Sequence, residues 1–193
     1  MASRSLKPTD ERSRDRARTR AKIMEAAKVA FSKYGYGGAN IRDIAAEAGI
    51  TGALVVRYFG SKEKLFEEAL ADAFDLGQAF ASTERRELGE AIVAHLFSEQ
   101  QVVDLTAMML LASVDPSANP VARRLAHARM LHPMMKLIGG KNAEQRAALI
   151  LSLVTGVWFY RFMLPLRPLS GRSDASTKGR VAAQIQRIID GAD

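Results

Sequence analysis

The sequence predicts an all-α protein in which three N-terminal helices are joined by a long helix to a C-terminal helical bundle, with about nine helices in total. Apolar residues recur at intervals of three and four along most of the chain, which is the period of an α-helix. Glycine and proline interrupt the pattern, and no strand-like alternation of useful length occurs. Because 48% of the 193 residues are hydrophobic, the chain can bury a sizeable core.

The N-terminal segment is predicted to change from arm to helix at Arg16. Residues 1–15 are polar, charged and without periodicity, so we expect a flexible basic arm. The helix from Arg16 ends at Gly35, which suits a C-cap. Its apolar face is predicted to consist of Ile23, Ala26, Ala27, Ala30, Phe31 and Tyr34.

Two short helices follow over residues 41–48 and 51–58. Asn40 is the predicted N-cap of the first helix, and Thr51 is that of the second. Gly49 supplies the turn between them. A short amphipathic helix, a glycine turn and a second short helix are the layout of a helix-turn-helix, which also occurs in proteins that never contact DNA.

The rest of the chain is predicted to be helical. Ser61 caps a long helix that runs to about Ala81, and Pro133 should kink the helix that it interrupts. The apolar run from Ala147 to Tyr160 is shorter than the roughly 18–20 residues that span a bilayer, which favours a buried helix. Further helices are predicted at 84–97, 100–114, 120–138, 142–164 and 177–190.

The positive charge is concentrated in the first third of the sequence. Residues 1–66 hold 14 Lys and Arg against 7 Asp and Glu, whereas the remainder is balanced, so the net charge of +7 belongs to the first third. This asymmetry indicates that the first third binds an anionic partner, either nucleic acid or a membrane surface. The alternative is a solvated basic tail. Cysteine is absent, and the N-terminus has no apolar segment, so we expect a cytoplasmic protein without disulfides, thiol chemistry or a secretory signal.

Residues Arg20 to Leu70 resemble the DNA-binding domain of the tetracycline-repressor (TetR/AcrR) family. The similarity rests on three runs: Ile23-x-x-Ala26-Ala27-x-x-x-Phe31-x-x-x-Gly35-Tyr36, Ile41-x-Asp43-Ile44-Ala45-x-x-Ala48-Gly49-Ile50-Thr51, and Phe59-Gly60-Ser61-Lys62-Glu63-x-Leu65. The resemblance implies a helix-turn-helix domain over 16–60 and a ligand-binding and dimerisation domain over 61–193. It also implies a homodimeric regulator that binds a pseudo-palindromic operator.

The resemblance further implies roles for individual residues at the DNA. Arg42 matches a position that reaches a base edge, where a guanidinium suits guanine. Tyr58 and Lys62 match positions that hold phosphates. The start and exposed face of the recognition helix correspond to Thr51, Gly52, Ala53, Leu54, Val56 and Arg57.

The recognition helix departs from the family pattern at two positions. Val56 stands where the family usually has tyrosine, and Tyr58 stands where it usually has histidine. Because this helix is poor in hydrogen-bond donors, we expect base readout from Arg42 and Arg57, with apolar contacts to thymine methyls. The alternative for Arg57 is a phosphate contact without specificity. The arm could likewise follow a minor groove, add phosphate contacts or remain solvated.

In the C-terminal region the resemblance implies a dimer and a pocket for an apolar small-molecule effector. The dimer is predicted to involve Leu151, Val154, Trp158, Ile185 and Ile188, although their helices could instead be central to a monomer core. The candidate pocket residues, which plain core packing would equally explain, are Phe97, Met108, Met109, Met130, Met134, Trp158 and Phe162.

The favoured function is a ligand-released repressor, and two other classes compete with it. A non-specific or architectural DNA-binding protein would share the basic arm but show little operator preference. An enzyme is disfavoured because we find no nucleophile–base motif, phosphate loop or cluster of metal ligands, so no cofactor or metal is expected. The sequence does not distinguish a repressor from an activator.

Overall fold

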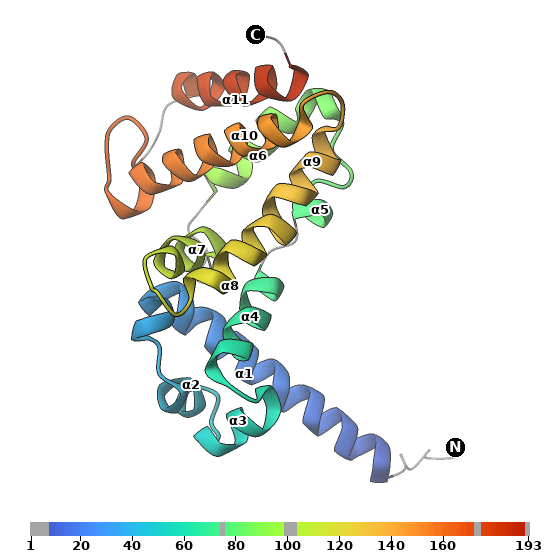
Figure 1. The fold of residues 1–193 in the computed structure, drawn as a ribbon, viewed down its shortest axis with the longest axis vertical. Coiled ribbons are helices and arrows are strands. Elements are labelled where there is room, and N and C mark those ends of the chain that lie inside the picture. Colours follow the sequence, from blue (N-terminus) through green and yellow to red (C-terminus); the bar gives the residue numbers. More distant parts are fainter. Residues whose placement is uncertain (1–7, 74–75, 99–103, 172–174, 192–193) are drawn as a thin grey trace, which may run out of the picture. The chain divides into compact units, whose positions relative to one another are not determined.

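The computed structural model describes residues 8–73, 76–98, 104–171 and 175–191, and in these ranges it contains helices and no strand (Figure 1). The all-α prediction is therefore confirmed. Contacts between Cα atoms divide the chain into two compact units. Unit 1 comprises Met1–Ala73 and Val102–Ala122, and unit 2 comprises Phe74–Gln101 and Arg123–Asp193.

Unit 1 is built around a long first helix. α1 (Pro8–Gly38) packs against α4 (Lys62–Ala73) and α7 (Leu105–Ser113), and the rings of Phe31 and Phe66 meet edge to face at 4.9 Å in the core between α1 and α4. α2 and α3 pack against each other at one end of this unit (Figure 1). The helices of unit 1 are α1 (Pro8–Gly38), α2 (Ile41–Glu47), α3 (Gly52–Phe59), α4 (Lys62–Ala73) and α7 (Leu105–Ser113).

The first helix begins earlier than the sequence pattern suggested, and its regular helical backbone is interrupted at Gly35, the predicted end. It begins at Pro8 rather than at Arg16, so residues 8–15 of the expected arm are helical, while Arg4 and Lys7 lie outside the described residues. Gly35, the predicted end, has φ 67° and ψ −179° and produces a kink within α1. A Cβ added at Gly35 would lie 3.0 Å from Cβ of Leu111 in α7, so the kink also permits a close helix approach.

Unit 2 is a set of helices packed around α10 and α11. α11 packs against α6, and α10 packs against both α9 and α11. α8 (Asn119–Leu125) contains the boundary between the units. The other segments are α5 (Leu76–Ala79), η1 (Arg85–Glu87), α6 (Leu88–Leu96), η2 (Ala126–Leu131), α9 (His132–Ile138), α10 (Ala143–Trp158), η3 (Phe159–Met163) and α11 (Ala175–Asp190).

Two predicted helices are subdivided in the structure. The helix expected to run from Ser61 to about Ala81 ends at Ala73, and a separate short helix, α5, follows. The helix predicted over 120–138 contains a π-helical turn, η2, immediately before the turn that holds Pro133. Proline lacks an N–H, and its ring crowds the carbonyl four residues earlier. The helix is therefore disturbed at the predicted place, and the disturbance is a wider, π-helical turn.

α10 and η3 together form a helical stretch of 21 residues, Ala143–Met163, which is long and apolar enough to cross a membrane by composition alone. This stretch is longer than the uncharged apolar run from Ala147 to Tyr160. The core helix of a water-soluble protein passes the same test, so one such helix is weak evidence for a membrane span. Only 28% of the apolar window is buried within the chain.

α6 and α11 approach each other closely at Gly89. A Cβ added at Gly89 would lie 2.5 Å from the carbonyl oxygen of Ala182, and the backbone N–H of Gly89 donates to Oε1 of Gln186 at 2.9 Å. We expect Gly89→Ala to lower the free energy of unfolding by about 1–3 kcal/mol, because overpacking outweighs the preference of about 1 kcal/mol for alanine in a helix.

Urea denaturation followed by the fluorescence of Trp158, the single tryptophan, measures this effect. Gly179→Ala is the matched control, because a Cβ at this exposed helical glycine meets nothing within 4 Å. It should be neutral or slightly stabilising. Equal or greater stability of Gly89→Ala would show that the two helices do not need this close approach.

Candidate nucleic-acid interface

α2 and α3 are joined by a turn that fixes how they pack. The side chain of Asn40 accepts a hydrogen bond from the backbone N–H of Arg42 at 2.8 Å, so Asn40 caps α2 as predicted. Gly49 has φ 70°, and the backbone N–H of Ile50 donates to the carbonyl of Ala45 at 2.9 Å. The turn therefore needs the left-handed conformation that glycine adopts most readily, as the sequence indicated.

α3 has a buried face and an exposed face. Val55 and Phe59 are buried in unit 1, which orients the helix. Thr51 is the N-cap by position, but its side chain makes no capping hydrogen bond. Of the residues assigned to DNA by resemblance, Thr51, Ala53, Val56 and Arg57 are exposed, and Gly52, Leu54 and Tyr58 are half-buried.

Arg42 and Arg57 are the cations of this helix pair. Arg42 lies in the first turn of α2 and Arg57 in the last turn of α3, and both are exposed. Within the described part of the chain, neither side chain makes a hydrogen bond or ion pair. Two guanidinium groups without protein partners are suited to bidentate contact with guanine or to binding phosphate.

Lys62, the first residue of α4, is held against an aromatic ring. It is half-buried, and its Nζ lies 4.5 Å from the centre of the Tyr36 ring, an attractive cation–π arrangement. Burial raises the pKa of Tyr36, and the charges of Glu63 and Asp115 raise it further. The predicted phosphate ligand is thus positioned at the start of α4 by a side chain of α1.

Asp115 lies close enough to Lys62 and Tyr36 for their charges to interact, although it is far from both in sequence. The hydroxyl of Ser117 donates a hydrogen bond to Asp115 at 2.6 Å, which with backbone hydrogen bonds and the charge of Lys62 holds the pKa of that carboxyl below its usual value. Neither Tyr36 nor Asp115 was predicted as a neighbour of Lys62. Tyr36 stood in the family motif, but no local pattern pairs residues 62 and 115.

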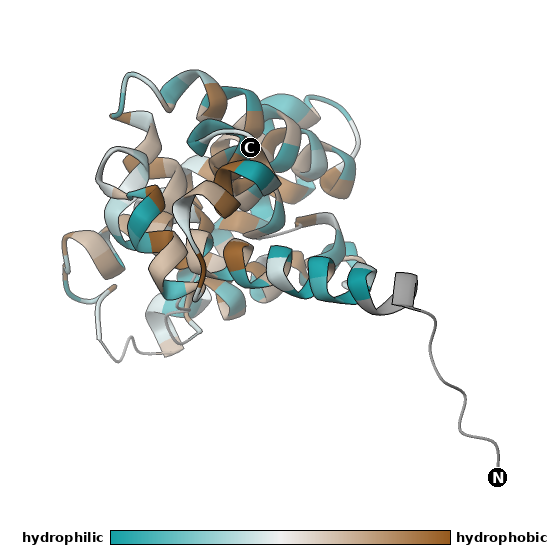
Figure 2. Ribbon diagram, turned by 90° about the horizontal axis from the view of Figure 1, so that it is seen from below, coloured by the Kyte–Doolittle hydropathy of each residue, from teal (hydrophilic) through white to brown (hydrophobic). Residues whose placement is uncertain are grey.

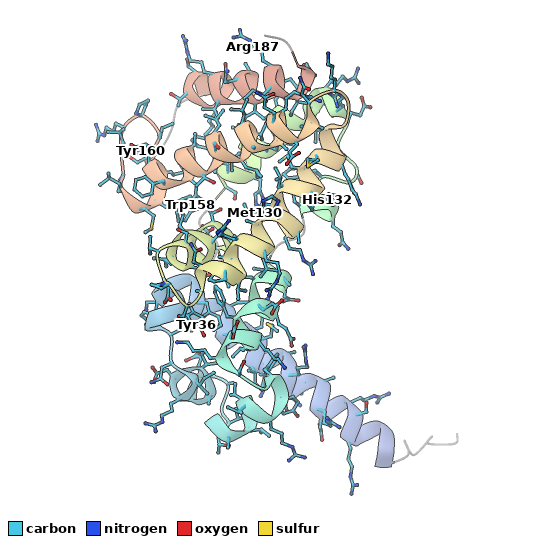
Figure 3. All side chains as sticks on the ribbon, viewed as in Figure 1. Tyr36, Met130, His132, Trp158, Tyr160 and Arg187 are labelled. Atoms are coloured by element: carbon cyan, nitrogen blue, oxygen red, sulfur yellow. The ribbon has the colours of Figure 1, made fainter. Side chains whose placement is uncertain are left out.

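The predicted pocket residues are divided between the units. Met108 and Met109 lie in α7 of unit 1, and the other five lie in unit 2. In unit 2 the ring centres of Trp158 and Phe162 are 5.8 Å apart. Trp158 of α10 and Met130 of η2 come from elements that pack together (Figure 3). Met134 is buried in α9.

Arg161 links two of the predicted aromatic residues. Its guanidinium lies 4.8 Å from the ring centre of Phe97 and 5.0 Å from that of Phe162. It also donates hydrogen bonds to the carbonyls of Leu169 (3.2 Å) and Phe97 (3.4 Å). The structure thus places Phe97 and Phe162 against an arginine that was not predicted, with Trp158 beside Phe162.

The predicted dimer residues differ in how much surface they offer. Ile185 and Trp158 are buried within unit 2, so they have almost no surface left for a second copy. Leu151, Val154 and Ile188 are half-buried. The exposed large apolar residues on the α10–η3 stretch are instead Leu149, Tyr160 and Met163, none of which was predicted at the dimer interface.

Comparison with known families matches both parts of the chain. Residues 23–69 match the family described as bacterial regulatory proteins, tetR family. Residues 86–189 match the tetracyclin repressor-like C-terminal domain. The second match alone covers more than half of the sequence.

Individual relatives agree with these matches. The chain is 25% identical over 163 residues to the HTH-type transcriptional regulator BetI 2 of Chromohalobacter salexigens, covering 76% of this chain and 78% of that protein. A TetR-family regulator from a Rhodococcus species superposes with a TM-score of 0.69 at 16% identity, covering 91% of this chain and 98% of that one. The multidrug binding protein EbrR complexed with proflavin superposes with a TM-score of 0.59 at 18% identity, covering 88% of this chain and 99% of that one. The last two likenesses show a shared fold.

Proposed function

The chain belongs to the tetracycline-repressor family of DNA-binding transcriptional regulators, and we propose that it is a homodimeric, cytoplasmic repressor released from a pseudo-palindromic operator by an apolar small molecule. Its recognition element is α3, supported by Arg42 of α2. The relatives are regulators rather than enzymes.

The exposed face of α3 is the observation that carries this proposal. Val55 and Phe59 anchor the helix in unit 1, while Val56 and Arg57 face outward, Val56 with 47% of its surface exposed. An exposed β-branched apolar residue beside an arginine suits the major groove, where thymine methyl groups and guanine acceptors are accessible. The net charge of +7 lies in the same N-terminal third of the sequence, which supports binding to a polyanion.

Dimerisation is supported by an apolar stripe on the α10–η3 stretch. Leu149, Leu153, Gly156 and Tyr160 recur at intervals of four, three and four residues and are exposed or half-buried. A Cβ added at Gly156 would meet nothing within 4 Å, so a second helix could approach there. A dimer also explains how one short helix per protomer can specify an operator, because two copies read two half-sites.

Sedimentation velocity at micromolar concentration tests the dimer. We expect about twice the chain mass of 21.1 kDa for the wild type, and the monomer mass for Leu149→Glu/Leu153→Glu, because a carboxylate buried without a partner opposes association. Ala94→Glu, which adds a carboxylate at an exposed position of α6, should remain dimeric. A monomeric wild type would exclude this assembly.

The effector is proposed to bind in unit 2 near Phe97, Trp158 and Phe162. Aromatic side chains suit an apolar, planar molecule, and EbrR, which shares the fold, forms a complex with proflavin. An effector that prefers a dimer with the wrong spacing of the two α3 helices would lower DNA affinity by shifting the population. Compounds that change Trp158 fluorescence should therefore also weaken operator binding, and binding without this effect would contradict the coupling.

The alternative function is a non-specific or architectural DNA-binding protein. It would use the same positive charge without an operator or an effector. Competition with bulk genomic DNA separates the two functions. A specific regulator should retain its selected operator in a large excess of competitor, whereas an architectural protein should not.

A further inference from the structure

The N-terminal turns of α1 extend beyond the core of unit 1. Residues 12–18 are all exposed, and the buried face of the helix begins at Ile23. In Figure 1 this part of α1 projects past α2, α3 and α4, and in Figure 2 the projecting helix is coloured mainly as hydrophilic. Ala17 is the one apolar residue among residues 12–20. The projecting helix is therefore polar, and its residues 12–18 are left exposed by the described part of unit 1.

One face of the projecting helix continues the buried face of α1. Arg16 and Arg12 precede Ile23 by seven and eleven residues, about two and three helical turns, so they lie on the same side of the helix as Ile23. Arg20 lies on this side as well. In place of apolar contacts, the face carries three arginines at intervals of four residues, which we term the arginine stripe (Arg12, Arg16 and Arg20).

Contacts of Arg20 show where the arginine stripe begins relative to the recognition helix. Its guanidinium lies 4.9 Å from the ring centre of Phe59, the last residue of α3, and it forms an ion pair with Glu68 of α4. Arg16 and Arg12 follow along the same face, toward the N-terminus. The stripe thus starts at the C-terminal end of α3 and runs away from it.

The charges on the projecting helix are distributed unevenly. Asp15, the one acid among residues 12–20, is displaced by about 100° from the centre of the arginine stripe, and Arg14 and Arg18 lie about 160° from it. Within the described part of the chain, Arg12 and Arg16 have no hydrogen bond or ion pair. Among the residues that the structure describes, these two arginines therefore present positive charge without a bonded acidic partner.

We propose that the arginine stripe binds the phosphate backbone of DNA flanking the half-site that α3 reads, an inference that rests on the proposed DNA-binding function. The helix is about 10–12 Å wide, whereas the minor groove is about 6 Å wide, so the segment lies on the backbone rather than within that groove. An anionic membrane is disfavoured because an interfacial helix needs an apolar face. Phosphates are spaced closely enough for Arg12 and Arg16, about 6 Å apart along the axis, to contact different ones.

The test compares two double variants that remove the same charge from opposite faces. Arg12→Gln/Arg16→Gln alters the stripe, and Arg14→Gln/Arg18→Gln is the matched control. Each is titrated by fluorescence anisotropy with a mixed-sequence duplex of about 40 base pairs over roughly 50–200 mM NaCl, because phosphate contacts do not depend on base sequence. Arg12→Lys/Arg16→Lys keeps the charge and the helix propensity, and should restore binding.

We expect the stripe variant to reduce the slope of log K against log salt by about 2 per protomer, because each lost phosphate contact accounts for about 0.9. The control should change the slope by less than half as much, and circular dichroism should show equal helix content in all variants. Equal slopes for the two Gln pairs, with wild-type binding intact, would overturn the stripe and leave the proposed function standing. A wild type that binds neither this duplex nor selected DNA would overturn both.

Discussion

Replacing Arg146 by methionine is expected to lower the free energy of unfolding of unit 2 by about 3–5 kcal/mol, because several buried or part-buried carbonyl groups would lose a charged donor together. Arg146 is the charged side chain buried in the described residues, at 9% exposure. Its guanidinium donates to the carbonyls of Lys141 (3.1 Å), Gly139 and Ile189, with a longer contact to Ile188.

The position of these carbonyls explains why the charge is stabilising. Gly139 follows the last residue of α9, and Ile189 lies in the last turn of α11. A helix C-terminus carries partial negative charge and unpaired carbonyl groups, so one guanidinium satisfies the ends of two helices. Methionine matches the length of the buried stem but donates nothing.

Urea denaturation followed by Trp158 fluorescence measures this loss, and the melting temperature should fall by roughly 10 °C. Arg187→Met is the matched control, because Arg187 also lies in the last turn of α11 but is exposed and points away from the core (Figure 3). We expect a change within about 0.5 kcal/mol for this control. Similar losses for both variants would show that Arg146 does not join the two helix ends.

Arg57→Ala is expected to weaken operator binding by about 2–6 kcal/mol in a dimer, because each half-site loses a bidentate base contact worth about 1–3 kcal/mol. Anisotropy titrations with the operator and with a scrambled duplex at one salt concentration measure the effect. Arg187→Ala removes the same charge from exposed α11 and should leave operator binding nearly unchanged.

The scrambled duplex separates the two possible roles of Arg57. If Arg57 reads a base, its replacement should cost much more affinity for the operator than for the scrambled duplex. If it contacts only phosphate, both affinities should fall equally. Equal losses would therefore leave Arg42 as the principal source of hydrogen-bonded base readout.

Sequence reasoning predicted those parts of the molecule that depend on local chemistry. Asn40 caps α2 because its short side chain reaches the N–H of Arg42, and Gly49 forms the turn because it adopts positive φ. Both effects depend on residues that are close in sequence, so they do not require a particular tertiary packing.

Sequence reasoning missed two kinds of feature. One depends on contacts between residues that are distant in sequence, and the other is a helix that extends through residues without an apolar face. The helical turns before Arg16 carry no apolar face, so periodicity could not reveal them. The burial of Arg146 depends on Ile189, and the surroundings of Lys62 include Asp115, and neither pairing has a local signature. Ile185 was predicted at a dimer surface, yet its side chain is buried within unit 2.

Selection of bound duplexes from a random pool by the full-length protein tests the central proposal most directly. If two α3 helices related by a two-fold axis read the DNA, the enriched sequences should form an inverted repeat, with half-site centres about one helical turn or a multiple of it apart. The same selection with Arg42→Ala/Arg57→Ala should lose this motif. A wild-type pool without an enriched inverted repeat would contradict the proposal that this chain is a dimeric, operator-specific regulator.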